Sequence, residues 1–366
     1  MSRPSTQAQA MGLRSNLSPE PESTRAIQWS RPSTQAQAMG LRSNLSPEPE
    51  STRAVQWMNR RRFLRHGVAL LGAAAGVPLL ACSRPADRPA NPAQGGPGMS
   101  EPTSASPAAR MPVLFVGHGS PMNAIADNRF SRAFQALGKA VPRPRAILSV
   151  SAHWFVPGTF LTDNLRPPTI HDFGGFPQSL FDMQYPAPGD PDLARRVVAL
   201  LGAATASLRG DWGLDHGTWT VLHHAFPGAD VPVVQLSIDS RLPPSGHLLL
   251  GQALAPLRDE GVLILGSGNI THNLAHVFSQ GFRDDAPTPD WADAFDADVA
   301  RACERHDGAH LARAIDLEDG RMSHPTPDHY LPLLYVAGAA APGDAVTFPI
   351  TGFDLGSLSM RAVRFG

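Results

Sequence analysis

Short apolar runs, separated by stretches with helical periodicity, are the feature that most constrains the fold of this chain. Each run has the length of a buried strand and is bounded by Gly, Pro or polar residues. The runs occupy residues 113–116, 146–150, 231–236 and 262–265. Buried strands that alternate with helical stretches are typical of a sheet covered by helices.

Helix signals lie between and after these runs. Asp190 and Pro191 begin one helix, because Asp is favoured at an N-cap and Pro at the first helical position. Further helices are predicted at residues 247–258, 291–306 and 328–340, and a final strand at residues 357–365. We therefore expect residues 111–366 to form a single α/β domain with a mixed central sheet flanked by helices.

Residues 1–57 form a tandem repeat. Residues 2–29 recur as residues 30–57, with Val55 in place of Ile27 as the single difference. The repeated unit lacks the apolar periodicity with which solenoid units stack on one another. We therefore expect the segment to be disordered. It is either an upstream duplication before a true start at Met58 or a solvated tail, and we exclude it from the fold.

The pattern of residues 58–82 is that of a twin-arginine export signal. Arg60 and Arg61 precede an apolar stretch, residues 68–80, that is too short to span a bilayer as a permanent helix. The stretch ends in Leu-Leu-Ala-Cys82, which resembles a lipoprotein cleavage box with Cys82 as the lipidated residue; cleavage without lipid is the alternative. We expect an exported protein of the periplasm or cell envelope, tethered by the Pro/Ala/Gly/Ser-rich linker of residues 83–110.

Charge and cysteine content exclude nucleic acid as a partner and a cysteine cluster as a metal site. The chain carries 31 Lys and Arg against 32 Asp and Glu, so no net field steers it onto nucleic acid. Its two cysteines are Cys82, inside the signal, and Cys303. The single thiol left in the domain forms neither an internal disulfide nor a thiolate cluster. A metal ion in this domain would therefore be bound by His, Asp or Glu.

Several of the 14 histidines follow predicted strands. His118 and His153 follow the first and second runs, and His272 comes shortly after the fourth. His329 lies at the start of the last predicted helix. Ligands of open α/β sheets bind beyond the carboxyl ends of the strands, where side chains distant in sequence converge. One such histidine is more simply a hydrogen-bonded loop residue, but several together predict a metal site.

His216 is a further candidate. It lies in Gly213-Leu-Asp-His216-Gly-Thr-Trp219, where the neighbouring Asp215 suits a group that accepts a proton or hydrogen-bonds a substrate. A turn residue is the alternative. His223 and His224 lie on the apolar stretch that follows, and we expect them to be structural or to support the site.

Motifs along the whole of residues 111–366 resemble the DOPA 4,5-dioxygenase-like branch of the class III extradiol dioxygenases. They are Gly117-His118-Gly-Ser-Pro-Met, Ser151-Ala-His153-Trp, Asp172-Phe-Gly-Gly-Phe-Pro, Gln184-Tyr185-Pro-Ala-Pro-Gly, Gly213-Leu-Asp-His216-Gly, Gly266-Ser-Gly-Asn-Ile-Thr-His272-Asn and His324-Pro-Thr-Pro-Asp-His329-Tyr. The resemblance implies a single α/β domain related to the catalytic subunit of protocatechuate 4,5-dioxygenase.

The resemblance also implies roles for individual histidines. His118 and His153 correspond to the two metal-binding histidines, and His329 to a further position of the metal site. His272 corresponds to the acid/base near the metal, and in this branch it is also counted as a ligand; His216 is the second candidate for proton transfer.

Metal identity is the point at which the sequence departs from the wider class. That class binds Fe2+ through two histidines and a carboxylate, whereas His329 stands where the carboxylate is expected. The predicted cofactor is one divalent ion per chain, Zn2+ or Fe2+. Zinc fits an all-histidine site but has no redox chemistry, which oxygen activation requires.

The implied partners are a small phenolic or catechol substrate and O2. The resemblance implies that the two catechol oxygens bind the metal and that the ring opens beside a hydroxyl-bearing carbon. The ring would be covered by Phe173, Phe176, Trp154 and Trp219, with core packing as the alternative for each. Two other functions fit the same histidines, a zinc-dependent hydrolase and a non-catalytic metal-binding lipoprotein.

Overall fold

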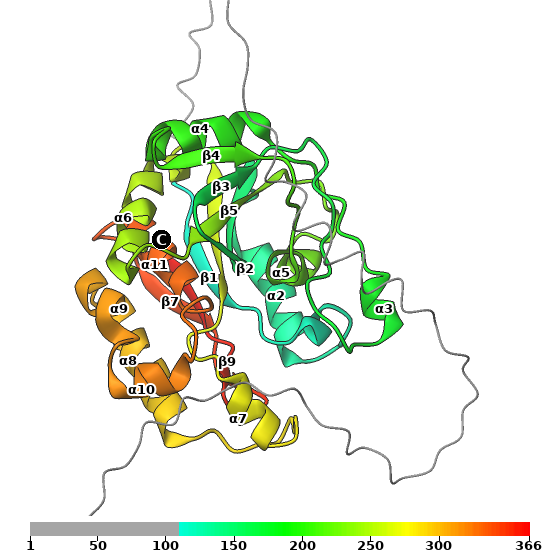
Figure 1. Cartoon of the computed structure of the whole chain (residues 1–366), viewed down its shortest axis with the longest axis vertical. Coiled ribbons are helices and arrows are strands. Elements are labelled where there is room, and N and C mark those ends of the chain that lie inside the picture. Colours follow the sequence, from blue (N-terminus) through cyan, green and yellow to red (C-terminus); the bar gives the residue numbers. More distant parts are fainter. Residues whose placement is uncertain (1–109) are drawn as a thin grey trace, which may run out of the picture. The chain divides into compact units, whose positions relative to one another are not determined.

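An eight-stranded sheet organises residues 110–366, which are the part of the chain that the computed structural model describes (Figure 1). The spatial order of the strands is β4-β3-β5-β2-β6-β1-β10-β7. Their bounds are β1 (Val113–Gly117), β2 (Ala146–Val156), β3 (Thr159–Thr162), β4 (Ala206–Arg209), β5 (Val233–Asp239), β6 (Val262–Gly268), β7 (Val346–Ile350) and β10 (Ala362–Phe365). Strands β5, β2, β6 and β1 are mutually parallel, whereas β3 with β5, β1 with β10 and β10 with β7 pair antiparallel. The predicted mixed sheet is confirmed.

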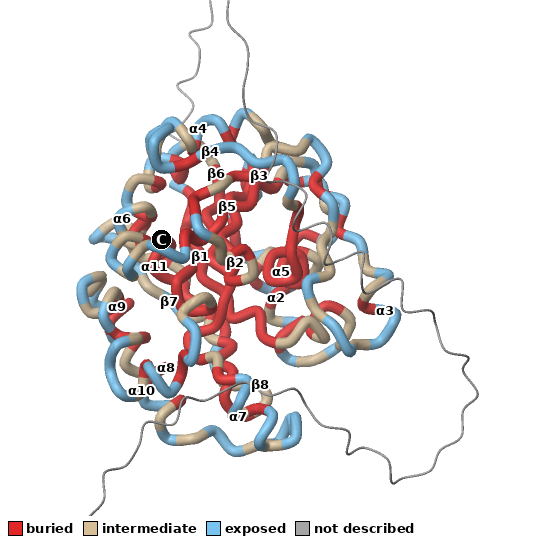
Figure 2. Tube along the Cα trace, viewed as in Figure 1, coloured by how far each residue is buried: buried red, intermediate tan, exposed pale blue. Residues whose placement is uncertain are grey.

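Helices cover both faces of this sheet. Side chains alternate between the faces of a strand, and on β1 Val113 and Phe115 pack into one apolar cluster while Leu114 and Val116 pack into another. The first cluster includes α4, α6, α8, α9 and α11, and the second includes α2 and α5. Figure 2 shows that buried residues concentrate in the central strands and in α5.

The bounds of the helices are as follows. The α-helices are α2 (Arg129–Ala140), α3 (Gln178–Phe181), α4 (Pro191–Leu201), α5 (His216–Ala225), α6 (Pro244–Leu254), α7 (Leu274–Ser279), α8 (Asp290–Glu304), α9 (Gly308–Ala314), α10 (Glu318–Ser323) and α11 (Leu331–Ala339). Two 3-10 helices are η1 (Pro121–Ala124) and η2 (Ala255–Arg258). Helix α4 begins as predicted, because the Asp190 side chain accepts a hydrogen bond from the Leu193 amide over 2.9 Å.

Two predicted elements in the last part of the sequence differ in the structure. The final strand, predicted at residues 357–365, divides into β9 (Leu358–Ser359), which pairs with β8 (Phe353–Asp354) in a separate small sheet, and β10. The helix predicted from residue 328 begins at Leu331, where Pro332 occupies a position in the first turn that tolerates the missing amide.

The prediction placed His153 just beyond the end of a strand, but His153 lies inside β2. This strand pairs with β6 as far as Ser151 and regains its pairing with β5 at Phe155, after an irregularity in register. Such irregularities redirect side chains and are common beside active sites. The short apolar run therefore marks only the first half of the strand.

Strands β2, β6 and β1 place the candidate residues at one edge of the sheet. The three strands are adjacent and parallel, so their carboxyl ends meet at this edge. The chain leaves β1 at His118, and the loop after β6 leads to His272. This is the position at which open α/β sheets bind ligands.

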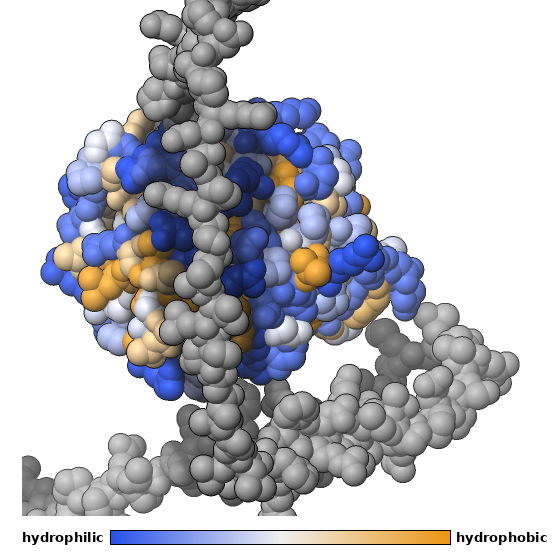
Figure 3. Space-filling model, turned by 90° about the horizontal axis from the view of Figure 1, so that it is seen from above, coloured by the Kyte–Doolittle hydropathy of each residue, from blue (hydrophilic) through white to orange (hydrophobic). Residues whose placement is uncertain are grey.

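The predicted repeat, export signal and linker, apart from Arg110, lie outside the described residues. Among the described residues, no helix has the length and apolar character needed to cross a membrane. The face seen in Figure 3 is largely hydrophilic, with apolar residues in separate patches.

Candidate metal centre

Histidines from four separate elements meet at the carboxyl edge of the sheet. The backbone amide of His118 donates to the Gly268 carbonyl over 3.0 Å, which fixes His118 where β1 ends beside β6. His153 projects from β2, and His216 is the first residue of α5. His329 precedes α11, and its carbonyl accepts from the Asn269 amide over 3.0 Å.

Glycines allow these elements to approach one another. A Cβ atom at Gly268 would lie 2.1 Å from the carbonyl oxygen of His329. At Gly217 it would lie 2.5 Å from Ser151 Oγ and 2.9 Å from His153 Cδ2. Any larger residue would displace the backbone or the imidazole, so both positions require glycine.

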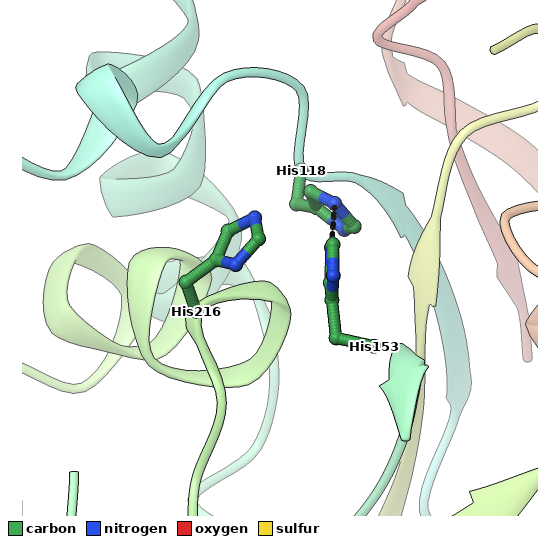
Figure 4. Close-up of side chains that lie close together, drawn as sticks. All are labelled: His118, His153 and His216. Carbon is green, nitrogen blue, oxygen red and sulfur yellow. Dashed lines mark hydrogen bonds between the residues drawn. The ribbon is translucent and has the colours of Figure 1, made fainter. Parts of the chain in front are cut away.

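The imidazoles of His118, His153 and His216 form the tightest group. Each offers a nitrogen atom, and the three atoms lie within 4.8 Å of one another (Figure 4). The Nε2 atoms of His118 and His153 are 3.1 Å apart. The ring of His329 lies at a similar range, with its centroid 5.2 Å from that of His118 and 5.0 Å from that of His153.

Carboxylates fix the orientation of three of these rings. Asp172 Oδ2 accepts from His216 Nδ1 over 2.9 Å and lies 3.1 Å from His153 Nδ1. Asp328 Oδ2 accepts from His329 Nδ1 over 2.5 Å. A carboxylate only accepts, so each Nδ1 carries the proton and each Nε2 carries the lone pair. Metal-binding histidines are held in this way by acceptors on their second nitrogen.

A hydroxyl group holds the fourth ring. Ser267 Oγ donates to the Gly217 carbonyl over 2.5 Å, so its interaction with His118 Nδ1, over 3.0 Å, is one in which it accepts. His118 therefore also carries its lone pair on Nε2. The four imidazoles together form the neutral donor set that a divalent zinc or iron ion prefers, and they fit such an ion.

Burial keeps most of these imidazoles neutral. It lowers the pKa of His118 well below the ordinary value, lowers that of His216 to about 4, and lowers that of His329. Burial also acts on His153, but the hydrogen bond to Asp172 and the charges of nearby carboxylates raise its pKa overall. Neutral imidazole is the form that binds metal.

A family model matches residues 112–350, and its description is the catalytic LigB subunit of aromatic ring-opening dioxygenase. The chain belongs to this family. It is therefore an aromatic ring-opening dioxygenase of the extradiol type, as the resemblance in the sequence implies.

Relatives and a solved structure agree with this LigB-type assignment. The chain is 50% identical over 264 residues to a 4,5-DOPA dioxygenase extradiol of Escherichia coli, which covers 70% of the chain and 95% of that protein. It is 39% identical over 264 residues to a 4,5-DOPA dioxygenase extradiol of Beta vulgaris, covering 69% and 96%. A crystal structure of an uncharacterized Escherichia coli protein matches with a TM-score of 0.61 and 44% identity, covering 70% of the chain and 100% of that structure.

His272 lies beside this LigB-type cluster without belonging to its tightest group. Its ring stacks on that of His329, with centroids 3.5 Å apart and planes 3° apart. The backbone amide of His272 donates to the Ser323 carbonyl over 3.0 Å, which fixes the loop after β6. Burial, and then the charge that His329 would carry, lower the pKa of His272 well below its ordinary value. The structure thus brings all five predicted site histidines together.

The contacts of Asp172 with His153 and His216 could not be predicted from the sequence. Asp172 belongs to the motif Asp172-Phe-Gly-Gly-Phe-Pro, but nothing in the spacing of residues 172 and 216 shows that the two side chains meet. Burial would raise the pKa of its carboxyl, but hydrogen bonds from His153 and His216 hold that pKa far below its usual range. Asp172 is therefore ionised, and it would balance part of the charge of a cation bound there.

A second carboxylate is buried beneath the cluster. Asp215 caps α5, accepts from Ser151 Oγ over 2.7 Å, and also accepts from the Gln235 side chain. Burial raises the pKa of Asp215 to about 6. The sequence suggests Asp215, next to His216, as its possible partner. In the structure Asp215 instead bonds Ser151 and Gln235, and Asp172 is the partner of His216.

The aromatic residues predicted to cover a substrate divide into two groups. Trp154 and Trp219 are fully buried, which agrees with the core-packing alternative. Phe173 and Phe176 are partly exposed. The Phe173 ring lies 5.4 Å from the ring of His216, so this phenylalanine borders the histidine cluster.

Proposed function

We propose that this LigB-type chain opens the ring of a DOPA-like catechol with O2, using one divalent metal ion held by histidines. The observation that carries the proposal is the set of imidazoles whose Nδ1 atoms are held by oxygen atoms and whose Nε2 lone pairs are left free. The printed names of the Escherichia coli and Beta vulgaris relatives support the substrate class.

His118, His153 and His329 are the proposed ligands. Each Nδ1 has its own acceptor, and the three ring centroids lie 5.0 to 5.2 Å apart. A bound divalent ion lowers the pKa of a catechol hydroxyl, and iron also supplies the redox chemistry with dioxygen that zinc lacks. We therefore infer Fe2+ for turnover, while Zn2+ fits the same imidazoles.

His216 is assigned to the substrate side of the cluster. Its ring is bordered by Phe173, and the Phe173 ring in turn lies 6.1 Å from that of Trp219. An aromatic substrate ring packs favourably in such surroundings. Because Asp172 accepts from Nδ1, the Nε2 atom of His216 is free to accept a hydroxyl proton from the catechol.

His272 is the proposed second proton-transfer group. Stacking on His329 holds its ring beside the cluster, within the buried loop after β6. From there His272 takes the remaining hydroxyl proton and returns a proton as the ring opens. Two groups are proposed because a catechol has two hydroxyl protons to release when both of its oxygens bind a metal ion.

A zinc-dependent hydrolase is the second candidate. The observation in its favour is the all-imidazole donor set, which catalytic zinc sites use to activate water. Dioxygen consumption separates the two functions, because a hydrolase consumes none.

The test is oxygen uptake by the full chain with a panel of catechols, measured separately for protein loaded with Fe2+ and with Zn2+. We expect uptake with a DOPA-like catechol and Fe2+, together with the absorbance of a ring-opened semialdehyde, and no uptake with Zn2+. The same catechols with one hydroxyl removed serve as controls. Hydrolysis of esters or amides without oxygen uptake would establish the second candidate instead.

We also propose that the enzyme is exported and anchored to the cell envelope through a lipid on Cys82. The support is the sequence alone, the arginine pair followed by an apolar stretch that ends at Cys82. Labelling cells with a radioactive fatty acid and comparing the chain with a Cys82→Ala variant tests the lipid. Equal label in both would contradict it.

A further inference from the structure

A single carboxylate connects two imidazoles of the metal centre with a neighbouring loop. Asp172 Oδ2 faces the Nδ1 atoms of His153 and His216, and its Oδ1 accepts from the backbone amide of His216 over 3.0 Å. The Asp172 side chain is only 16% exposed. Three contacts thus converge on one side chain, from β2 and from the start of α5.

The loop that carries Asp172 also carries the aromatic residues beside the cluster. We call Phe173, Gly174, Gly175 and Phe176 the aromatic segment. The two phenylalanine rings lie 5.4 Å apart, and Phe173 also contacts the ring of His216. A Cβ atom at Gly174 or Gly175 would meet nothing within 4 Å, and Gly175 has a φ of +81°. The two phenylalanines pack against the second apolar cluster, whereas the space beside the two glycines between them is open. Asp172 adds a polar attachment of the segment to the metal centre.

We propose that Asp172 is a positioning residue that couples the aromatic segment to the metal centre. An ion held by His153 would strengthen the Nδ1 donor on the same ring, and the stronger contact would hold Asp172 and the segment behind it more firmly against the cluster. Coupling between two equilibria is reciprocal, so an ordered segment also tightens binding of the ion. The inference rests on the metal site of the proposed function and adds a residue that orders the substrate side of that site.

Asp328 provides a matched comparison within the same cluster. Its carboxylate also holds one proposed ligand, His329, and its side chain is 19% exposed, close to the value for Asp172. Asp328 is adjacent to His329 in the chain and has no contact with the aromatic segment among the described hydrogen bonds. Loss of either carboxylate should weaken metal binding, but only Asp172 should link that binding to the segment.

The experiment uses the full chain with Zn2+ as the probe and measures two quantities. One is the Zn2+ dissociation constant, by competition with a chelating dye. The other is amide hydrogen exchange of residues 173–176 with and without saturating Zn2+. We expect Asp172→Asn and Asp328→Asn each to raise the dissociation constant about 10- to 100-fold. Zn2+ should slow exchange of the segment in the wild type and in Asp328→Asn, and this slowing should be lost in Asp172→Asn.

A second variant keeps the test valid if Asp172→Asn does not fold. Phe173 offers no metal ligand, yet reciprocal coupling predicts that Phe173→Ala raises the Zn2+ dissociation constant about fivefold or more. An unchanged constant in Phe173→Ala, or Zn2+-induced slowing that persists in Asp172→Asn, overturns the inference.

Neither readout uses a catechol or O2, so the two proposals fail separately. Coupling without oxygen uptake overturns the proposed reaction alone. Oxygen uptake without coupling overturns the role of Asp172 alone.

Discussion

The Nε2 atoms of His118 and His153 lie 3.1 Å apart while the Nδ1 atom of each ring faces an oxygen acceptor. Two neutral imidazoles in these tautomers direct lone pairs at one another, which is unfavourable unless a proton or a cation lies between them. The protein folds these two side chains together from strands that are separated by β6 in the sheet. A cation shared by the two rings, as in the proposed metal site, would remove this unfavourable contact.

Removal of either imidazole should therefore remove the ion. We expect His118→Ala and His153→Ala each to lose most of the bound metal, by elemental analysis, with an unchanged circular dichroism spectrum, because both residues serve the site more than the core. His223→Ala, on the half-buried part of α5, is the control and should retain the metal. Full occupancy in either of the first two variants would contradict their assignment.

His329 and His216 should behave differently. If His329 is the third ligand, His329→Ala loses the metal, whereas His216→Ala retains it and instead raises KM for the catechol. Metal analysis of both variants, followed by steady-state kinetics with Fe2+, checks this. The reverse pattern would show that the ion sits among His118, His153 and His216, the group with the closest nitrogen atoms.

His272→Ala should keep the ion and lose rate. The ring of His272 stacks on His329 and lies outside the closest group of nitrogen atoms, so we expect proton transfer to be its main role. A positioned acid or base contributes about two to four orders of magnitude in rate. Single-turnover kinetics of the metal-saturated variant and wild type measures this loss of rate. Loss of metal comparable to that in His118→Ala would instead make His272 a ligand.

A histidine far from the site should make stability depend on pH. His247 is fully buried, with Nδ1 3.0 Å from the Tyr335 hydroxyl, and burial lowers its pKa to about 4 despite the nearby charge of Asp239. The unfolded chain binds the proton more readily, so the stabilisation is complete above the ordinary pKa of 6.5 and is lost as pH falls towards 4.

We expect the wild type to lose about 1–2 kcal/mol more unfolding free energy than His247→Gln between about pH 7 and about pH 5. Gln has no titrating group and retains a polar contact for Tyr335. Urea unfolding of both proteins at the two pH values measures the difference. Equal losses of unfolding free energy in the wild type and in His247→Gln would show that His247 does not titrate in this range.

Export should depend on the arginine pair. Changing Arg60 and Arg61 to Lys should leave precursor inside the cell, because twin-arginine export reads this pair specifically. Arg65→Lys, in the same basic region but outside the pair, is the matched control. Cell fractionation followed by immunoblotting reports the result, and unchanged export of the double variant would reject the twin-arginine pathway.

The fold was predictable where burial leaves a continuous apolar run. The four runs mark β1, β2, β5 and β6, because parallel strands in a covered sheet are apolar on both faces. Helix α5 was not predicted, since residues 216–222 are buried on all sides and show no polar face. Helix α2 was also missed, although Phe130, Phe134 and Leu137 repeat at helical spacing and Asn128 begins a capping box.

The site was predictable only in part, for a geometric reason. His118 follows a strand, so the sheet itself places it at the ligand-binding edge. The pairing of Asp172 with His153 and His216 depends on how the loop after β3 folds back, and sequence spacing does not encode that path. Contacts between side chains on different loops can be found only from the structure.

The strand order β6-β1-β10 has a consequence for how the metal centre forms during folding. Strand β1, which ends at His118, is completed on one side by residues 262–268 and on the other by residues 362–365, at the very end of the described chain. The backbone position of His118 is therefore set by strands that lie far apart in the sequence. Pairings of this kind form slowly, because a long loop must close before each pair can form, so the frame of the metal centre depends on the slowest contacts of the sheet.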